Sequence, residues 1–227
     1  MADNSVPNPI FPDELLARLK RSRVVAGFPI EREEHAVPLA AALLAGGIDT
    51  IELTLRTPAA MAALRIVCAE VPKLRVGVGT ILTPELVKEV KAAGADFGVA
   101  PGMNPRVVRA AREAGLPFAP GIATPSDLEA AIELGCRFVK FFPAEATGGV
   151  SYLRSMSAPY KHLGIQYFPL GGLNADNMSG YLAEANVPVI GGSWIAKKDL
   201  IDAEDWAGIT ARAAAVCKLL KQGSNDE

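Results

Sequence analysis

Short apolar runs alternate with longer stretches in which apolar residues recur every three or four positions, from Arg23 to the end of the chain. Short runs bounded by glycine and proline are typical of buried strands, and the longer periodic stretches are typical of helices. The predicted strands are Arg23–Phe28, Thr50–Leu55, Leu74–Val78, Asp96–Ala100, Pro117–Ala119, Arg137–Phe142, Ile165–Leu170 and Val187–Ile190. The predicted helices include Glu33–Ala45, Pro58–Glu70, Pro84–Ala93, Pro105–Ala114, Ser126–Leu134 and Ala175–Glu184.

Two local signals support this alternation. Several predicted helices open with a cap residue before proline, because the cap side chain satisfies a free N–H group and proline needs no partner. These pairs are Thr57-Pro58, Thr83-Pro84, Asn104-Pro105 and Thr124-Pro125. The second signal is a glycine that ends a helix shortly before a phenylalanine that opens a strand. It recurs as Gly94 with Phe97, Gly115 with Phe118 and Gly135 with Phe138. A repeat with a period of about 20 residues indicates stacked supersecondary units.

Strands and helices alternating along 227 residues predict an α/β fold, the (β/α)₈ TIM barrel. A doubly wound open sheet is the alternative. That fold usually has a glycine-rich turn after its first strand, whereas Phe28-Pro29-Ile30 follows here. The composition shows no linker, so we predict one domain over residues 1–227, with flexible polar tails at 1–10 and 222–227.

Charge and cysteine content narrow the class of protein. With 23 basic and 25 acidic residues the net charge is −2, which does not favour nucleic acid or an anionic membrane as a partner. Cys68, Cys136 and Cys217 are odd in number and far apart, as is typical of reduced thiols in the cytoplasm. No apolar run approaches the roughly 20 residues of a membrane span. Residues 1–10 lack the features of a signal peptide.

One lysine interrupts the apolar strand predicted over Arg137–Phe142. Lys140 lies between Val139 and Phe141. Burial among apolar side chains disfavours the ammonium form, and a neutral lysine amine is a nucleophile that can form a Schiff base with a carbonyl substrate. The alternative is a lysine at a strand end whose flexible stem reaches solvent.

Strand alternation gives this lysine a partner. In Thr50–Leu55 the aliphatic residues share one face, and Glu52 lies on the other. The aliphatic face of a barrel strand meets the helices, so Glu52 and Lys140 are both predicted to point inward. A buried carboxylate and amine are costly unless they are paired or used, which leaves a structural ion pair or a catalytic pair. Because histidine is scarce, general acid–base catalysis would fall to Glu52.

Other candidate residues cluster where predicted strands end. Arg56 follows Glu52 by four residues, and it is either a surface guanidinium or a clamp for a substrate carboxylate. Glycine pairs Gly171-Gly172 and Gly191-Gly192 follow the last two predicted strands. Barrel active sites lie at this end, and these two loops commonly bind phosphate through backbone N–H groups.

Metal chemistry is not favoured by the sequence. The two histidines, His35 and His162, are far apart and have no acidic or cysteine partner at the spacing of metal ligands. A zinc-dependent aldolase or hydrolase is therefore not expected. The chain also lacks the G-x-S-x-G and P-loop motifs.

Five segments together resemble a known family. The segments are Glu52-Leu53-Thr54-Leu55-Arg56-Thr57, Gly77-Val78-Gly79-Thr80, Lys140-Phe141-Phe142-Pro143-Ala144-Glu145, Gly171-Gly172 and Gly191-Gly192-Ser193-Trp194. Their order and spacing are similar to those of the bacterial 2-keto-3-deoxy-6-phosphogluconate (KDPG) / 4-hydroxy-2-oxoglutarate (KHG) aldolases. The resemblance runs from about Arg23 to the last helix.

The resemblance implies a class I aldolase on a homotrimeric barrel, acting on a small-molecule 2-keto acid without a cofactor or metal. Lys140 would be the Schiff-base lysine and Glu52 the proton shuttle. The implied substrate-binding residues are Arg56, Thr80 and Pro101 at the pyruvyl end, Phe142 against the substrate, and Gly171, Gly172, Gly192 and Ser193 at the phosphate end.

The implied reaction is cleavage of KDPG to pyruvate and glyceraldehyde 3-phosphate, of KHG to pyruvate and glyoxylate, or of both. Leu170 stands where family members acting on the gluconate-derived substrate usually have threonine, and losing a hydroxyl relaxes discrimination between hydroxyl configurations. An aldolase for the C4 epimer or another 2-keto-3-deoxy acid is one alternative. A non-covalent phosphate-binding isomerase or synthase, and a binding protein that kept the barrel, are the others.

Overall fold

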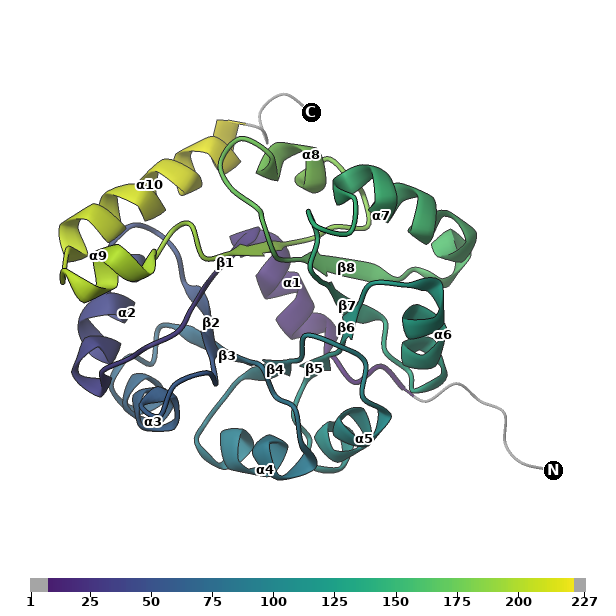
Figure 1. The fold of residues 1–227 in the computed structure, drawn as a ribbon, viewed down its shortest axis with the longest axis horizontal. Helices are drawn as coiled ribbons and strands as arrows, with labels where there is room; N and C mark the ends of the chain where they lie inside the picture. Colours follow the sequence, from purple (N-terminus) through teal and green to yellow (C-terminus); the bar gives the residue numbers. More distant parts are fainter. Residues whose placement is uncertain (1–7, 223–227) are drawn as a thin grey trace.

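Parallel strands form a ring with helices around its outside in the computed structural model, which describes residues 8–222 (Figure 1). The strands are β1 (Val24–Phe28), β2 (Thr50–Thr54), β3 (Arg75–Gly79), β4 (Phe97–Val99), β5 (Phe118–Ala119), β6 (Gly121–Ile122), β7 (Phe138–Phe141), β8 (Gln166–Pro169) and β9 (Ile190–Gly192). The helices are α1 (Asp13–Ser22), η1 (Glu33–His35), α2 (Ala36–Ala45), α3 (Ala60–Glu70), α4 (Pro84–Ala92), α5 (Pro105–Glu113), α6 (Pro125–Glu133), α7 (Gly149–Ser157), η2 (Ala158–Leu163), α8 (Met178–Leu182), α9 (Lys198–Asp202) and α10 (Trp206–Gln222).

The strand order confirms the barrel and rules out the open doubly wound sheet. Hydrogen bonds join β5-β4-β3-β2-β1-β9 in one run and β6-β7-β8 in another. The two runs meet twice. β5 and β6 are consecutive in the chain, and β8 packs beside β9, where a Cβ on Gly191 would lie 2.7 Å from Leu170.

The fifth barrel strand is longer than predicted and is broken in the middle. Pro120 separates β5, which pairs with β4, from β6, which pairs with β7. Proline has no N–H to give to a ladder, so it divides the strand. Its carbonyl still accepts the N–H of Lys140 at 2.9 Å, and this bond holds β7 against the break.

Helix starts follow the cap prediction at three of the four positions. The side chains of Thr83, Asn104 and Thr124 accept backbone N–H groups, and Thr124 forms a capping box with Asp127. The fourth prediction is wrong. The Thr57 hydroxyl donates to the Ile30 carbonyl instead of capping a helix, and α3 begins only at Ala60.

Two other predicted elements also differ from the structure. The helix predicted over Ala175–Glu184 is only Met178–Leu182, because Asn174 accepts the N–H groups that follow it in a turn. The strand predicted over Val187–Ile190 is Ile190–Gly192, since these residues pair with β1. The second glycine pair therefore lies within a strand rather than after it.

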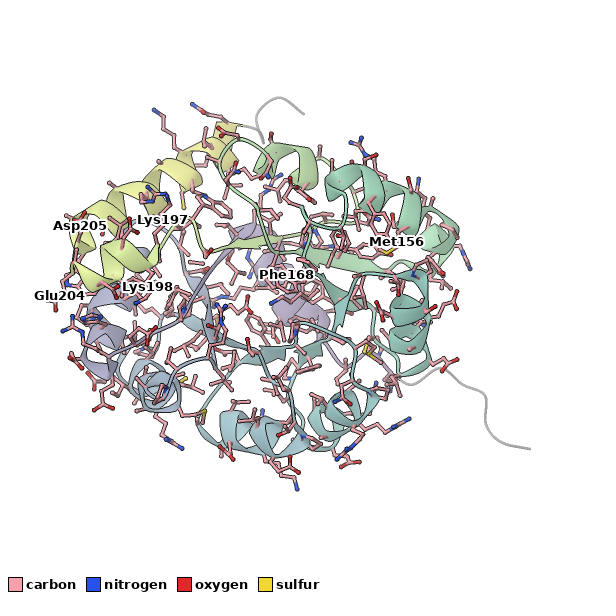
Figure 2. All side chains as sticks on the ribbon, in the orientation of Figure 1. Met156, Phe168, Lys197, Lys198, Glu204 and Asp205 are labelled. Carbon is pink, nitrogen blue, oxygen red and sulfur yellow. The ribbon has the colours of Figure 1, made fainter. Side chains whose placement is uncertain are left out.

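A separate apolar cluster fills the inside of the ring. Phe168 of β8 lies there (Figure 2), and the cluster also contains Phe97 and Phe138. Helix α1 closes the end where the strands begin, with Leu19 and the preceding Phe11 buried against this cluster. The Phe11 and Phe138 ring centroids are 4.7 Å apart. The sequence analysis had not predicted this helix.

The predicted tails fall largely on residues 1–7 and 223–227, which lie outside the described residues. Within the described part, Ile10 is buried and Gln222 is the last residue of α10. Among the helices of residues 8–222, none combines the length and the apolar character that a membrane crossing needs.

Candidate active site

Glu52 and Lys140 meet inside the ring. Lys140 Nζ lies 2.9 Å from Glu52 Oε1, and both side chains are buried, with exposed fractions of 7% and 2%. They come from β2 and β7, at positions where strand alternation directs the side chain inward. The inward direction predicted for both residues agrees with this geometry, and the two side chains form a buried ion pair and hydrogen bond.

Glycines on the two neighbouring strands leave room for the Glu52 carboxylate. A Cβ on Gly79 of β3 would lie 2.0 Å from Glu52 Oε1, and a Cβ on Gly27 of β1 would lie 3.5 Å from Oε2. Gly27 is the register partner of Glu52. The Glu52 side chain therefore occupies a slot between two glycines, and its carboxylate can point at Lys140 without crowding.

Lys140 is surrounded by aromatic and backbone groups. Its Nζ lies 5.2 Å from the centroid of the Phe142 ring, within the range of a cation–π contact. Its register partner on β6 is Gly121, where a Cβ would lie 2.2 Å from the carbonyl oxygen of Pro101. Glycine at this position lets the Pro101 backbone approach β6 beside the lysine.

Arg56 lies just after β2, the strand of Glu52, and Thr80 lies just after the neighbouring strand β3. Thr80 has a φ of 66°, in the left-handed region that β-branched residues rarely adopt. Strained backbone of this kind is concentrated at functional sites. Arg56 is exposed, and its Nε donates to Oγ1 of Thr54 at 3.1 Å.

The Gly171-Gly172 turn is held against the segment that follows β7. Both glycines have positive φ, 95° and 86°, so the turn requires glycine. The Glu145 N–H donates to the Gly171 carbonyl at 3.0 Å, and a Cβ on Gly172 would lie 2.6 Å from Glu145 Cβ. The Glu145 carboxylate accepts the hydroxyl of buried Tyr181, and burial, together with this hydrogen bond, raises the pKa of Tyr181.

Gly192 and Ser193 lie at the end of β9, the strand beside β8 and its turn, and they differ in depth. Gly192 is buried, pairs with Ala26 of β1, and leaves space for the Trp194 ring, which a Cβ would meet at 1.6 Å. Ser193 is exposed directly after β9. Leu170, at the end of β8, is buried in the interior cluster with an exposed fraction of 6%.

Two cysteine thiols of the described chain have raised pKa values. Burial raises the pKa of Cys136 to about 12 and that of Cys68 to about 11, so both thiols stay protonated and unreactive at neutral pH. Residues 8–222 contain no group of three or more histidine, cysteine or acidic side chains that could hold a metal ion.

Fold and site together define a barrel enzyme with an amine and a carboxylate paired at its centre. The family model for KDPG and KHG aldolases matches residues 15–212. The chain is 44% identical over 190 residues to the 2-dehydro-3-deoxy-phosphogluconate aldolase of Dickeya dadantii (strain 3937), covering 84% of this chain and 88% of that protein. It is 42% identical to the KHG/KDPG aldolase of Escherichia coli (strain K12), with the same coverage.

A solved structure agrees with these relatives. The KDPG aldolase from Legionella pneumophila, with pyruvate captured as a covalent carbinolamine intermediate, superposes with a TM-score of 0.85 at 38% identity, covering 88% of this chain and 97% of that one. The chain therefore belongs to the KDPG and KHG aldolase family and is a carbon–carbon lyase.

The sequence analysis gave no role to Thr54, Gly27 or Gly79, which contact Arg56 or border Glu52. The signal was present in the strand alternation. Thr54 shares the inward face of β2 with Glu52, and glycines on both neighbouring strands indicate a large side chain between them.

Proposed function

We propose that this chain is a class I aldolase in which Lys140 forms the Schiff base and Glu52 moves the protons. The observation that carries the proposal is the buried 2.9 Å contact between Lys140 Nζ and Glu52 Oε1. A nucleophilic amine needs a base within hydrogen-bond reach, and the contact with Glu52 provides one.

Proton transfer within the pair prepares the nucleophile. Glu52 accepts a proton from the Lys140 ammonium, and the neutral amine attacks the C2 ketone of the substrate to give a carbinolamine. Glu52 returns the proton to the carbinolamine hydroxyl, which leaves as water, and an iminium forms. The glycines beside Glu52 support this cycle because they leave room for its carboxylate next to the lysine amine.

Bond cleavage uses the same two groups. Glu52, acting through water, takes the C4 hydroxyl proton, the C3–C4 bond breaks, and its electron pair moves to the iminium to form an enamine. The aldehyde product leaves. Protonation at C3 regenerates the iminium, and water then releases pyruvate and the free lysine.

The remaining residues are assigned to the two ends of a small 2-keto acid. Arg56, Thr80 and Pro101 would line the pyruvyl end, where a guanidinium matches a carboxylate. Phe142 would pack on the substrate. Gly171, Gly172, Gly192 and Ser193 would face the phosphate, although Gly192 could act only through its buried backbone.

We propose KDPG, KHG or both as substrates, in line with the activities for which the relatives are named. The test is borohydride reduction in the presence of pyruvate, followed by peptide mass analysis. Reduction should fix one pyruvate on the Lys140 peptide as a secondary amine. Labelling of another lysine, or of none, would refute the Schiff-base assignment, and turnover without labelling would support a non-covalent barrel enzyme.

The assembly and the setting of the enzyme are also proposals. By family resemblance we propose a homotrimer, which sedimentation equilibrium at micromolar concentration would contradict by giving a monomer mass. We propose one domain and a cytoplasmic location, and the three free cysteines support that location because they persist in a reducing compartment.

A further inference from the structure

Arg56 is anchored to a single residue in the barrel wall. Its Nε donates to Oγ1 of Thr54 at 3.1 Å, and its backbone N–H donates to the Thr54 carbonyl at 2.9 Å. Thr54 is buried, with an exposed fraction of 7%, whereas Arg56 is exposed. The long and otherwise mobile guanidinium side chain therefore starts from a fixed point at the end of β2.

The Thr54 hydroxyl can serve Arg56 in one orientation only. It donates to the Phe28 carbonyl of β1 at 3.3 Å, and a carbonyl can only accept. The hydroxyl proton is therefore used in this hydrogen bond. The lone pairs of the hydroxyl oxygen face the Arg56 Nε–H, which can only donate. This arrangement fixes the rotation of the guanidinium about its stem.

The fixed guanidinium presents its two Nη groups. Its Nε is occupied, and neither Nη nitrogen has an acceptor among the residues that the structure describes. Two Nη groups on one plane match the two oxygens of a carboxylate. Reaching such a bidentate geometry costs less when the guanidinium is already oriented.

We propose that Thr54 is a positioning residue for substrate recognition, which orients Arg56 and so sets the preference of the enzyme for 2-keto acids over uncharged ketones. The inference rests on the proposed function, in which Arg56 binds the keto-acid carboxylate. Glu52, Thr54 and Arg56 then form one stripe along β2 and its end, for proton transfer, orientation and recognition in turn.

The test compares borohydride trapping on Lys140 with pyruvate and with acetone, which lacks a carboxylate. Thr54→Val keeps the shape of the side chain and removes the hydroxyl. We expect the half-saturating pyruvate concentration to rise about tenfold, as for loss of one hydrogen bond. Trapping of acetone should be unchanged, and so should kcat for cleavage at saturating substrate. Thr54→Ser retains the hydroxyl and should restore pyruvate binding.

Thr57→Val is the matched control. The Thr57 hydroxyl likewise donates to a backbone carbonyl, that of Ile30 just after β1, whereas the Arg56 guanidinium donates to Thr54. The control should shift pyruvate saturation by less than about twofold. In an Arg56→Ala background, Thr54→Val should have no further effect, because coupled residues are not additive.

The outcomes separate the inference from the proposed function. A loss of pyruvate binding equal in Thr57→Val, a parallel loss with acetone, or an additive loss in the Arg56→Ala background would show that Thr54 is merely structural. An unaffected Thr54→Val enzyme would also overturn the inference. If the wild-type protein forms no pyruvate adduct, the proposed function itself fails.

Discussion

Gly79→Ala should separate catalysis from folding. A Cβ at this position would lie 2.0 Å from Glu52 Oε1 and 2.9 Å from its carboxyl carbon. An ordinary contact begins at 3.4 Å, so the oxygen must retreat by about 1.4 Å, the difference between the two distances. The 2.9 Å contact with Lys140 cannot survive that retreat unless the lysine moves as well.

The magnitude follows from this displacement. A misplacement of about 1 Å in a catalytic group can cost on the order of 10²-fold in rate, and we expect kcat/KM to fall by that factor. The fold should tolerate the change. The atoms that must move belong to a flexible side chain, and Gly79 has no positive φ, so alanine fits the strand backbone. We expect the free energy of unfolding to change by less than about 1–2 kcal/mol.

The assay is cleavage of KDPG coupled to pyruvate reduction, together with thermal unfolding of the same samples. Gly27→Ala is the matched control, because its Cβ would meet the other carboxylate oxygen at an ordinary 3.5 Å. The kcat/KM of the Gly27→Ala enzyme should stay within about threefold of the wild-type value, because the added Cβ makes only an ordinary contact. Normal activity in Gly79→Ala, or equal losses in both variants, would refute the argument that the glycine slot sets the carboxylate position.

Three further predictions concern the chemistry and the substrate. Glu52→Gln should slow turnover by at least about 10²-fold in the cleavage assay while pyruvate binding largely survives, and a near-normal kcat would make Glu52 structural. EDTA should leave activity intact, and activity that vanished with the chelator and returned with zinc would overturn the Schiff-base proposal. Leu170→Thr should raise the kcat/KM ratio of KDPG over its C4 epimer by about threefold to tenfold, the worth of one hydrogen bond, and an unchanged ratio would remove position 170 from stereochemical control.

The sequence predicted what depends on local alternation and missed what depends on distant partners. Glu52 and Lys140 were directed inward correctly because the side-chain period of a strand is fixed by its backbone. Thr57 was predicted to cap a helix, but a hydroxyl takes whichever partner the fold brings near, and here that is the Ile30 carbonyl. The place of helix α1 could not be predicted for a similar reason, since its amphipathic pattern can indicate a helix but does not say which surface the apolar face will cover.

Helix α1 covers one end of the barrel interior. Phe11 and Leu19 close the end where the strands begin, and Phe138, two residues before Lys140, packs against Phe11 there. If Lys140 is the Schiff-base lysine, as we propose, substrate and water would both approach it from the other end, where the strands finish and barrel active sites lie. An aldehyde product held at that end would then also stand in the path of the water that hydrolyses the iminium. In the proposed mechanism, a shared approach of this kind predicts that the aldehyde departs before pyruvate is freed.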